Sequence, residues 1–213
     1  MSELMELVPN SPAEADESAK RRQIIEGARA VFMARGFDAA SMGDIAKAAG
    51  VSKGTLYVYF TDKDDLFSAI VQGECAMLAK GVFDFDHDDH DVEAVLLTHG
   101  RAFVSVIADP GRLSSFRTVI AVAERMPDLG RKVYEAGPAV GTTKLADYLR
   151  AQVDAGVLQV DDCEVAAAQF IESCHATLFK PMLFNFGGPP KPERVDHVVG
   201  IAVRTFLAAY RVK

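Results

Sequence analysis

The sequence has few cysteines and no long hydrophobic run. No stretch approaches the roughly 18 consecutive apolar residues that a membrane-spanning helix requires. The first 20 residues are acidic and lack the basic-then-apolar order of a secretion signal. Cys75, Cys163 and Cys174 have no Cys-x-x-Cys spacing, which argues against a zinc knuckle or a disulfide framework and predicts reduced thiols in the core. These absences predict a cytoplasmic protein with no membrane partner.

The chain also lacks the alternating apolar and polar pattern of β-strands, internal repeats and a glycine-rich phosphate loop. With 213 residues, 49% hydrophobic and 25% charged, it can bury one or two cores, which excludes general disorder. Apolar residues recur at helical spacing instead. We therefore expect an all-α fold of about nine or ten helices.

The net charge of −7 is unfavourable for contact with nucleic acid, but the charge is unevenly distributed. Residues 1–17 hold five acidic residues and no basic ones, whereas residues 18–66 hold eight basic residues against six acidic ones. Residues 67–213 are again acidic overall. Because binding to nucleic acid depends on where positive charge gathers, residues 18–66 are the segment in which a DNA site is expected.

The first helical pattern follows a polar tail. Residues 1–17 mix prolines, serines and acids without periodicity, and we expect a flexible tail there. From Ser18, apolar residues recur at offsets of one, three and four, which predicts a helix that ends near Gly36.

Three shorter helices are predicted next. Ser41 can cap a second helix, which Gly50 can end because glycine readily adopts positive φ. Ser52 can cap a third helix that runs to Phe60, and Thr61 can cap a fourth that runs to about residue 80.

Beyond residue 80, an acidic connector with two histidines precedes a series of longer helical patterns. Proline and glycine dipeptides separate these patterns at the places where helices should break. We expect helices over residues 92–108, 112–123, 128–136, 139–155, 162–184 and 192–211.

The order of small residues in the second and third predicted helices is typical of a helix-turn-helix. In that motif the first helix braces the second, which enters the major groove, so a small residue is needed at the crossing and a glycine at the turn. Ala46 and Gly50 stand at these positions, and Val51 and Leu56 can hold the recognition helix on its support. The spacing predicts a helix-turn-helix from Ser41 to Phe60.

The remaining side chains of the recognition helix suit a DNA groove. Hydroxyl and ammonium groups donate to phosphates and base edges, and a glycine permits close approach of the backbone. The alternative is a compact helical bundle in which the two tyrosines are half-buried packing residues. On the DNA-binding interpretation the contacting residues are Ser52, Lys53, Gly54, Thr55, Tyr57, Tyr59 and, at the start of the next helix, Lys63.

The segment SMGDIAKAAGVSKGTLYVYFTDKDDLFSAIV, Ser41 to Val71, resembles the DNA-binding segment of the TetR family of bacterial transcriptional regulators. The family pattern of Gly-Phe, then Gly-x-Leu-Tyr-x-aromatic-Phe, then Lys-x-x-Leu is present as Gly36-Phe37, Gly54 to Phe60 and Lys63 to Leu66. The resemblance implies a dimer that binds double-stranded operator DNA and uses no cofactor. It also implies the contacts just named, with Ser41 at the N-terminus of the supporting helix and Thr55 and Tyr57 reading bases.

The segment Phe116 to Pro138 resembles the C-terminal domain of the AefR-like branch of this family. The resemblance implies a DNA-binding domain over residues 18–66 and an effector-binding and dimerisation domain over residues 67–213. It further implies a repressor that is released from its operator by a small effector. Effector binding would shift the fourth helix, residues 62–80, and so change the separation of the two recognition helices.

The last two helical patterns are the expected dimer interface. Their small residues permit close approach of helices, and a symmetric operator favours a symmetric dimer because one recognition helix reads few bases. Core packing within one subunit is the alternative. The residues concerned are Val165, Ala166, Gln169, Phe170, Ser173, Cys174, Thr177, Val195, Val198, Val199, Ala202, Phe206 and Ala209.

Large apolar or amphipathic residues in the C-terminal bundle are candidates for the effector pocket. Such residues at helical spacing are usually packing residues, so more than half of them should belong to the core. Because no charged cluster marks a ligand, the expected effector is apolar or aromatic. The candidates are Met77, Phe83, Phe103, Phe116, Val119, Ile120, Met126, Tyr134, Tyr148, Phe170, Cys174 and His175.

The sequence offers residues for three other functions. His87 and His90 in the acidic connector could bind a metal if that segment were helical, but a hydrated linker without an apolar frame explains it better, and no metal is expected. Cys174 and His175 could serve an enzyme, yet adjacent helix positions point about 100° apart, and no enzyme is expected. A helical protein-interaction module that does not bind DNA is the alternative function.

Overall fold

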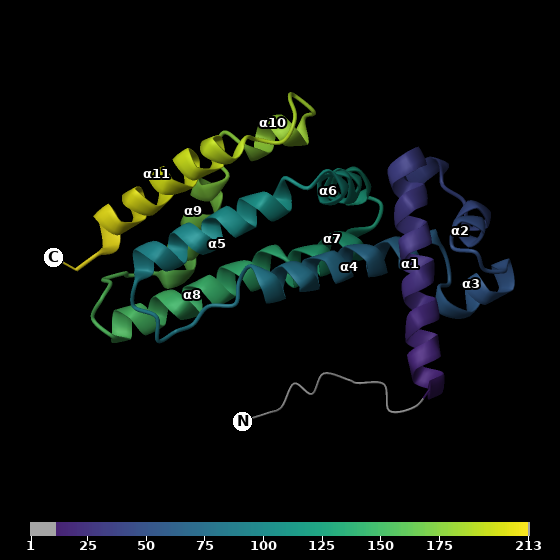
Figure 1. Ribbon diagram of the computed structural model, residues 1–213, viewed down its shortest axis with the longest axis horizontal. Helices are drawn as coiled ribbons and strands as arrows, with labels where there is room; N and C mark the ends of the chain where they lie inside the picture. The colour runs from purple at the N-terminus through teal and green to yellow at the C-terminus, as the bar shows by residue number, and fades with distance from the viewer. Residues whose placement is uncertain (1–11, 213) are drawn as a thin grey trace. The chain divides into compact units, whose positions relative to one another are not determined.

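The computed structural model describes the backbone of residues 12–212, and their side chains except those of residues 12–16 and 77–80. Within this range the regular structure is helical, apart from an isolated β-bridge between Leu158 and Arg211. It forms eleven helical segments, of which one has only five residues, where about nine or ten helices were expected. The all-α prediction is confirmed (Figure 1).

Contacts divide the chain into two compact units, one ending at Ile70 and the other beginning at Val71. The family resemblance had implied a domain boundary between residues 66 and 67. The first unit contains α1 (Pro12–Ala39), α2 (Met42–Ala48), α3 (Lys53–Tyr59) and the start of α4 (Lys63–Gly81).

Helix α1 begins earlier than expected. Residues 12–17, expected in the flexible tail, are helical, and residues 1–11 of that tail lie outside the described residues. Pro12 suits a helix start because its missing N–H would be unpaired there, and acidic residues favour the positive end of the helix. The expected break at Gly36 is confirmed, because this residue has φ 75° and ψ 167°.

Three phenylalanines form the centre of the first unit. The ring centroids of Phe32, Phe37 and Phe67 lie 5.0 to 5.5 Å apart, and all three residues are buried. Two of these rings flank Gly36 in sequence and the third comes from α4. The change of direction at Gly36 therefore brings the rings into contact and joins α1 to the start of α4.

The second unit contains the rest of α4 and seven further helices. Helix α8 packs on α9, and α11 packs on both α5 and α9 (Figure 1). No helix among the described residues is long and apolar enough to cross a membrane. The helices are α5 (Val92–Ile107), α6 (Pro110–Val122), α7 (Pro127–Ala136), α8 (Pro138–Asp154), α9 (Cys163–Cys174), α10 (Phe179–Leu183) and α11 (Pro192–Tyr210).

The single helix predicted over residues 162–184 was wrong, because the structure divides it into α9 and α10. Thr177, between them, has φ 64°, a left-handed conformation that ends regular helix. Pro181 is the sequence signal for this break. Inside one long helix its ring would clash with the carbonyl group of Thr177, whereas in the first turn of α10 it is tolerated.

The connector before α5 is held by α8 and is not a freely hydrated linker. The fully buried side chain of Gln152 accepts a hydrogen bond from Nδ1 of His90 at 2.7 Å and donates one to the carbonyl oxygen of His87 at 2.9 Å. The hydroxyl of Tyr148 donates to the carbonyl oxygen of Asp89 at 2.9 Å, and burial, with nearby carboxylates, raises the pKa of this tyrosine. Side chains of α8 thus hold a segment whose own sequence offers no frame.

Candidate functional site

Serine side chains begin both helices of the helix-turn-helix, as predicted. Oγ of Ser41 accepts a hydrogen bond from the amide N–H of Asp44 at 3.1 Å, and Oγ of Ser52 accepts one from the amide N–H of Thr55 at 3.0 Å. Gly50 has φ 64° in the turn between them. Because each cap joins residues only three apart, local sequence is sufficient to set the start of each helix.

A close contact between the backbones of α1 and α2 was not predicted. A Cβ atom on Gly27 would lie 2.7 Å from Cα and Cβ of Ala49, and Nε2 of Gln23 donates to the carbonyl oxygen of Ala49 at 2.7 Å. Ala46, the small residue expected where α2 and α3 cross, is buried. An isolated glycine within a helical pattern usually has a packing reason, so Gly27 was the available signal.

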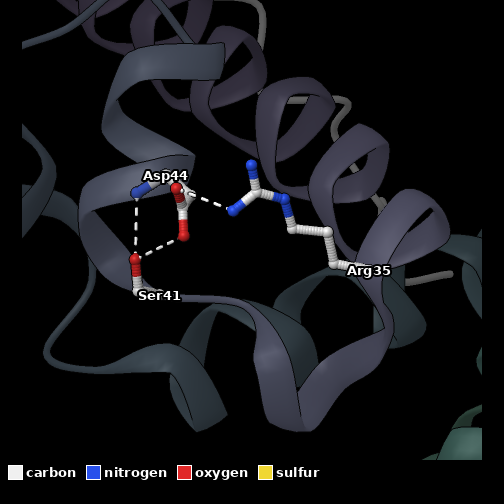
Figure 2. A network of polar contacts seen from close by, with 3 residues as sticks. All are labelled: Arg35, Ser41 and Asp44. Atoms are coloured by element: carbon white, nitrogen blue, oxygen red, sulfur yellow. Dashed lines mark hydrogen bonds and ion pairs between the residues drawn. The ribbon is translucent and has the colours of Figure 1, made fainter.

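An ion pair links α1 to the start of α2, where two hydrogen bonds join Ser41 and Asp44 (Figure 2). Asp44 accepts a 2.6 Å hydrogen bond from the hydroxyl of Ser41, and its other oxygen lies 2.9 Å from Nη1 of Arg35. The hydrogen bond from Ser41, with the charge of Arg35, lowers the pKa of Asp44. Its carboxylate is therefore charged at neutral pH, and the adjacent guanidinium offsets that charge.

One face of α3 is turned to solvent. Leu56 is fully buried on the opposite side, whereas Tyr57 is 53% exposed and Val58 is 80% exposed. Gly54 and Val58 are four residues apart, so both lie on the line most distant from Leu56. Of the predicted contact residues on or beside this helix, Ser52, Lys53, Gly54 and Tyr57 are exposed, and Thr55 and Tyr59 are half-buried.

Val58 was missed in the sequence because apolar residues of this helix were assigned to packing. Its position two residues from Leu56 was the available signal, since such residues point about 200° apart around a helix. An exposed apolar side chain on a recognition face can contact the methyl group of thymine.

Lys63 has intrachain partners that the sequence did not indicate. Its Nζ donates to the carbonyl oxygens of Phe37 and Asp38 at 2.7 and 3.2 Å, and lies 4.5 Å from the centre of the Phe37 ring. Two of the three ammonium protons are thus engaged within the first unit. Lys63 therefore holds the segment after Gly36, with one N–H left for another partner.

The second unit has an interior cavity of only about 10 Å³. Four predicted pocket residues line it, namely Phe83, Phe103, Phe170 and Cys174. Five of the lining residues were not predicted: Phe85, His99, Gly100, Leu145 and Ile171. A space of this size holds about one water molecule, so aromatic rings fill the interior.

Several other pocket candidates lie elsewhere. Phe116, Ile120 and Tyr134 are 36%, 52% and 64% exposed, so their expected place inside the bundle was wrong. The hydrophobic stripes of α6 and α7 are wider than the faces that these helices bury. His175 packs against the Phe103 and Phe179 rings, and Tyr148 holds the connector. Val119 is buried and Met126 is half-buried, and neither lines the cavity. The side chain of Met77 lies outside those described.

The chemistry of these groups does not suit catalysis. Burial raises the pKa of the Cys174 thiol to about 12, so it stays protonated and weakly nucleophilic. Nε2 of the neighbouring His175 lies 3.5 Å from the carboxylate of Glu172 on the surface. Among the residues whose side chains are described, no group of three or more histidine, cysteine or acidic residues is placed to hold a metal ion.

The thirteen residues expected at the dimer interface lie partly in the core of the subunit and partly on its surface. Seven of the thirteen are buried within the subunit and pack in its core, where the alternative had placed them: Ala166, Phe170, Cys174, Val198, Val199, Ala202 and Phe206. Val165, Gln169, Ser173, Thr177 and Ala209 are exposed, and Val195 is half-buried. Ile201, which is 44% exposed on α11, was not predicted.

Comparison with known proteins agrees with this arrangement of a helix-turn-helix unit and a separate helical unit. Residues 24–70 match the family described as bacterial regulatory proteins, tetR family. Residues 94–212, more than half of the chain, match the C-terminal domain described as AefR-like transcriptional repressor. The chain is a helix-turn-helix transcriptional regulator and not an enzyme. It belongs to the TetR family, in the branch with an AefR-like C-terminal domain.

Individual relatives support the assignment. An HTH-type transcriptional repressor of Mycobacterium tuberculosis is 39% identical over 62 residues, which are 29% of this chain and 33% of that protein. The match thus spans only about a third of this curated relative. A solved TetR-family regulator from Mesorhizobium loti is 30% identical with a TM-score of 0.86, and the match covers 92% of this chain and 98% of that one. The flavonoid-responsive regulator FrrA is 29% identical with a TM-score of 0.75, over 92% and 99% of the two chains.

Proposed function

We propose that this chain is a one-component repressor that acts in the cytoplasm, where residues 18–66 bind operator DNA and residues 67–213 dimerise and bind a small effector. The exposed face of α3 carries the proposal, because Leu56 anchors this helix while Gly54, Tyr57 and Val58 are left to solvent. A helix held in this way presents a rigid face to a major groove. The family match over residues 24–70 supports the same use.

The contacts to DNA follow from exposure and chemistry. Tyr57 and Lys53 are exposed and can donate to phosphates or base edges, and Gly54 permits close approach of the backbone. The remaining N–H of Lys63 can reach a phosphate. Ser41, Ser52 and Thr55, at the starts of α2 and α3, are also proposed to contact DNA. Tyr59 is proposed to make a further contact.

Val58 is the addition that the geometry makes to this set. With 80% of its surface in water, it has no packing role within the chain. In the major groove its two methyl groups can make apolar contact with the 5-methyl group of thymine. Gly54, one turn earlier, has no side chain that would hold the helix away from the bases. We infer that Val58 favours a thymine in each half-site.

The effector is proposed to be a flat aromatic molecule. Four aromatic rings, those of Phe83, Phe85, Phe103 and Phe170, and the imidazole of His99 line the interior cavity. The similar regulator FrrA is described as flavonoid-responsive, which supports an aromatic ligand. Because the cavity measures only about 10 Å³, such a ligand must bind a more open state than this one, and it would stabilise that state.

Helix α4 is the proposed link between ligand and DNA. It is one continuous helix, Lys63–Gly81, that begins in the first unit and continues into the second. Within the second unit, Nη1 of Arg112 on α6 donates to the carbonyl oxygen of Glu74 at 3.3 Å, and the thiol of Cys75 approaches the carbonyl oxygen of Val133 on α7 at 3.9 Å. Rearrangement of α6 and α7 around a ligand would therefore move α4.

The experiment is titration of the fluorescently labelled DNA upstream of the protein's own gene. We expect affinity to fall at least about 100-fold between 50 and 200 mM salt, because phosphate contacts release counterions. Tyr57→Ala should weaken binding about 10-fold to 100-fold and leave the dimer intact. Tyr134→Ala is the matched control, because that tyrosine is also exposed but lies on α7.

Two results would count against the proposal. If the wild-type protein binds no duplex at low salt, the alternative of a helical interaction module without DNA replaces it. For the effector, a panel of flavonoids is added to the DNA complex. Release of DNA supports the aromatic class, whereas a flavonoid that binds free and DNA-bound protein equally is not an inducer.

A further inference from the structure

Two phenylalanines, Phe184 and Phe186, project from the loop that joins α10 to α11. They are 79% and 82% exposed, among the most exposed large apolar residues of the described chain. Side chains of this size contribute little to the stability of a chain when they remain in water. Because the two residues are so close in sequence, they form one apolar projection, which we name the aromatic loop.

The aromatic loop has a defined backbone. The amides of Phe184, Asn185 and Phe186 donate to carbonyl oxygens of residues 180–182 at 2.8 to 3.0 Å. Asn185 has φ 56°, a conformation that asparagine adopts more readily than most residues. The backbone that carries the two rings is therefore ordered before a partner binds, so a partner does not have to order this segment.

An arginine from another helix supports the loop. Arg117 on α6 donates through Nε and Nη2 to the carbonyl oxygens of Leu183 and Met182, at 2.9 and 2.5 Å. Met182 is buried, which anchors α10 on the second unit. The loop is thus fixed at both its own turn and its base.

The second unit also carries a groove that no described part of the chain fills. It has a volume of about 300 Å³ and lies between the end of α9 and the face of α11. On the scale by which the 10 Å³ cavity holds one water, this groove has room for many waters that apolar rings could displace. The lining includes Ala176, Val198, Ile201 and Ala202, together with Arg194 and His197.

The groove lining fits an aromatic occupant. Ala176 and Ala202 leave space, and Val198 and Ile201 supply apolar surface. The guanidinium of Arg194 is held by a 2.8 Å hydrogen bond to Oγ1 of Thr177, which also lines the groove. A cation fixed in this way can lie over an aromatic ring and attract it.

We propose that, in the dimer, the aromatic loop of each protomer binds in the α9–α11 groove of a second copy of this chain. A two-fold interface must be self-complementary, and this chain carries both an apolar projection and a groove of matching chemistry. Four buried rings in two grooves then extend the contact made by α9 and α11. The inference rests on the dimer of the proposed function, but not on its binding of DNA.

The first test measures the dimer dissociation constant by sedimentation equilibrium. Phe184→Ser with Phe186→Ser should weaken the dimer at least about 100-fold, as expected when anchor residues of an interface are lost. Tyr134→Ser, an equally exposed aromatic residue on α7, should leave the constant unchanged. Ala176→Trp, which fills the groove, should weaken the dimer similarly, and adding it to the loop variant should cause no further loss.

The second test locates the loop directly. Protomers with Phe186→Cys are mixed with protomers with Ile201→Cys, both in a background of Cys75→Ser and Cys163→Ser. A disulfide-linked dimer that forms in the mixture more readily than in either preparation alone supports the proposal. An unchanged dissociation constant in the loop variant, or a mixture that does not cross-link, would overturn it, as would loop-dependent binding to phospholipid vesicles by a monomer.

Binding of DNA by the same proteins separates the two proposals. If wild-type protein binds the upstream DNA while the loop variant keeps a normal dimer, only the aromatic-loop proposal fails. If the loop variant loses the dimer but the wild-type protein binds no DNA, the aromatic-loop proposal stands and the proposed function fails.

Discussion

Gly27 of α1 lies against Ala49 at the end of α2, so closely that a Cβ atom on the glycine would be 2.7 Å from Cα of the alanine. The two helices therefore cross with their backbones in contact, next to the hydrogen bond from Gln23 to Ala49. This contact sets how α2 is seated on α1, and α2 in turn supports α3.

Gly27→Ala should destabilise the first unit by about 2 kcal/mol, although alanine normally stabilises a helix relative to glycine by about 1 kcal/mol. The added methyl group overlaps backbone atoms, which cannot move aside as a side chain could. Denaturant unfolding followed by circular dichroism measures the change. Gly73→Ala on α4 is the matched control, since a Cβ there meets nothing within 4 Å. A stabilised Gly27→Ala protein would refute the close crossing.

Val58→Ala should weaken binding to the upstream DNA about fivefold for each thymine contacted, since roughly 1 kcal/mol of apolar contact is removed. Copying the same DNA with deoxyuridine in place of thymidine removes only the 5-methyl groups, so the wild-type protein should lose a similar factor. On uracil DNA the variant and the wild type should then bind alike. Val212→Ala, at an exposed valine that follows α11, is the control. If uracil DNA binds wild-type protein as tightly as thymine DNA, Val58 does not read the methyl group.

The link between α1 and α2 should depend on pH through Asp44. Because the pKa of this carboxyl is below its ordinary value of 3.8, its contribution to stability is present above that value and is lost as the pH falls through the lowered pKa. Ser41→Ala should raise the pKa of Asp44, because the Ser41 hydroxyl is the largest cause of the shift. A carboxyl titration by NMR measures both effects. An unchanged Asp44 titration in Ser41→Ala would show that the hydrogen bond in Figure 2 is not formed in solution.

Gln152→Leu should destabilise the second unit by about 2 kcal/mol, because it leaves the His87 carbonyl oxygen and the His90 ring without their buried partner. Hydrogen exchange should become faster at the amides of residues 86–91. Tyr148→Phe, which removes one bond to the same segment, should have a smaller effect of about 1 kcal/mol. Gln159→Leu, at an exposed glutamine, is the control. Unchanged exchange in Gln152→Leu would contradict the role given to α8.

Much of the first unit could be predicted from sequence because its signals are local. Ser41 and Ser52 cap helices through bonds to residues three positions later, and Gly36 and Gly50 mark turns that only positive φ allows. Val58 was missed for a different reason. Whether an apolar residue of a short helix faces inward or outward depends on what that helix packs against.

The second unit was harder to predict because its faces are set by distant partners. Phe103 lines the cavity while Ile120 and Tyr134, equally plausible by composition, face solvent. The break at Thr177 follows from Pro181, but the structure alone shows that the chain then forms the separate helix α10 and the aromatic loop.

By itself, the sequence determined the helical class, the helix-turn-helix and the family, because caps, turns and apolar periodicity act over three or four residues. Only the tertiary structure decided the crossing of Gly27 with Ala49, the exposed position of Val58 and the order of the acidic connector. Those features depend on contacts between residues far apart in the chain, such as the bond between His90 and Gln152 across 62 positions. Such pairs meet only when whole helices have packed, which no local pattern of residues records.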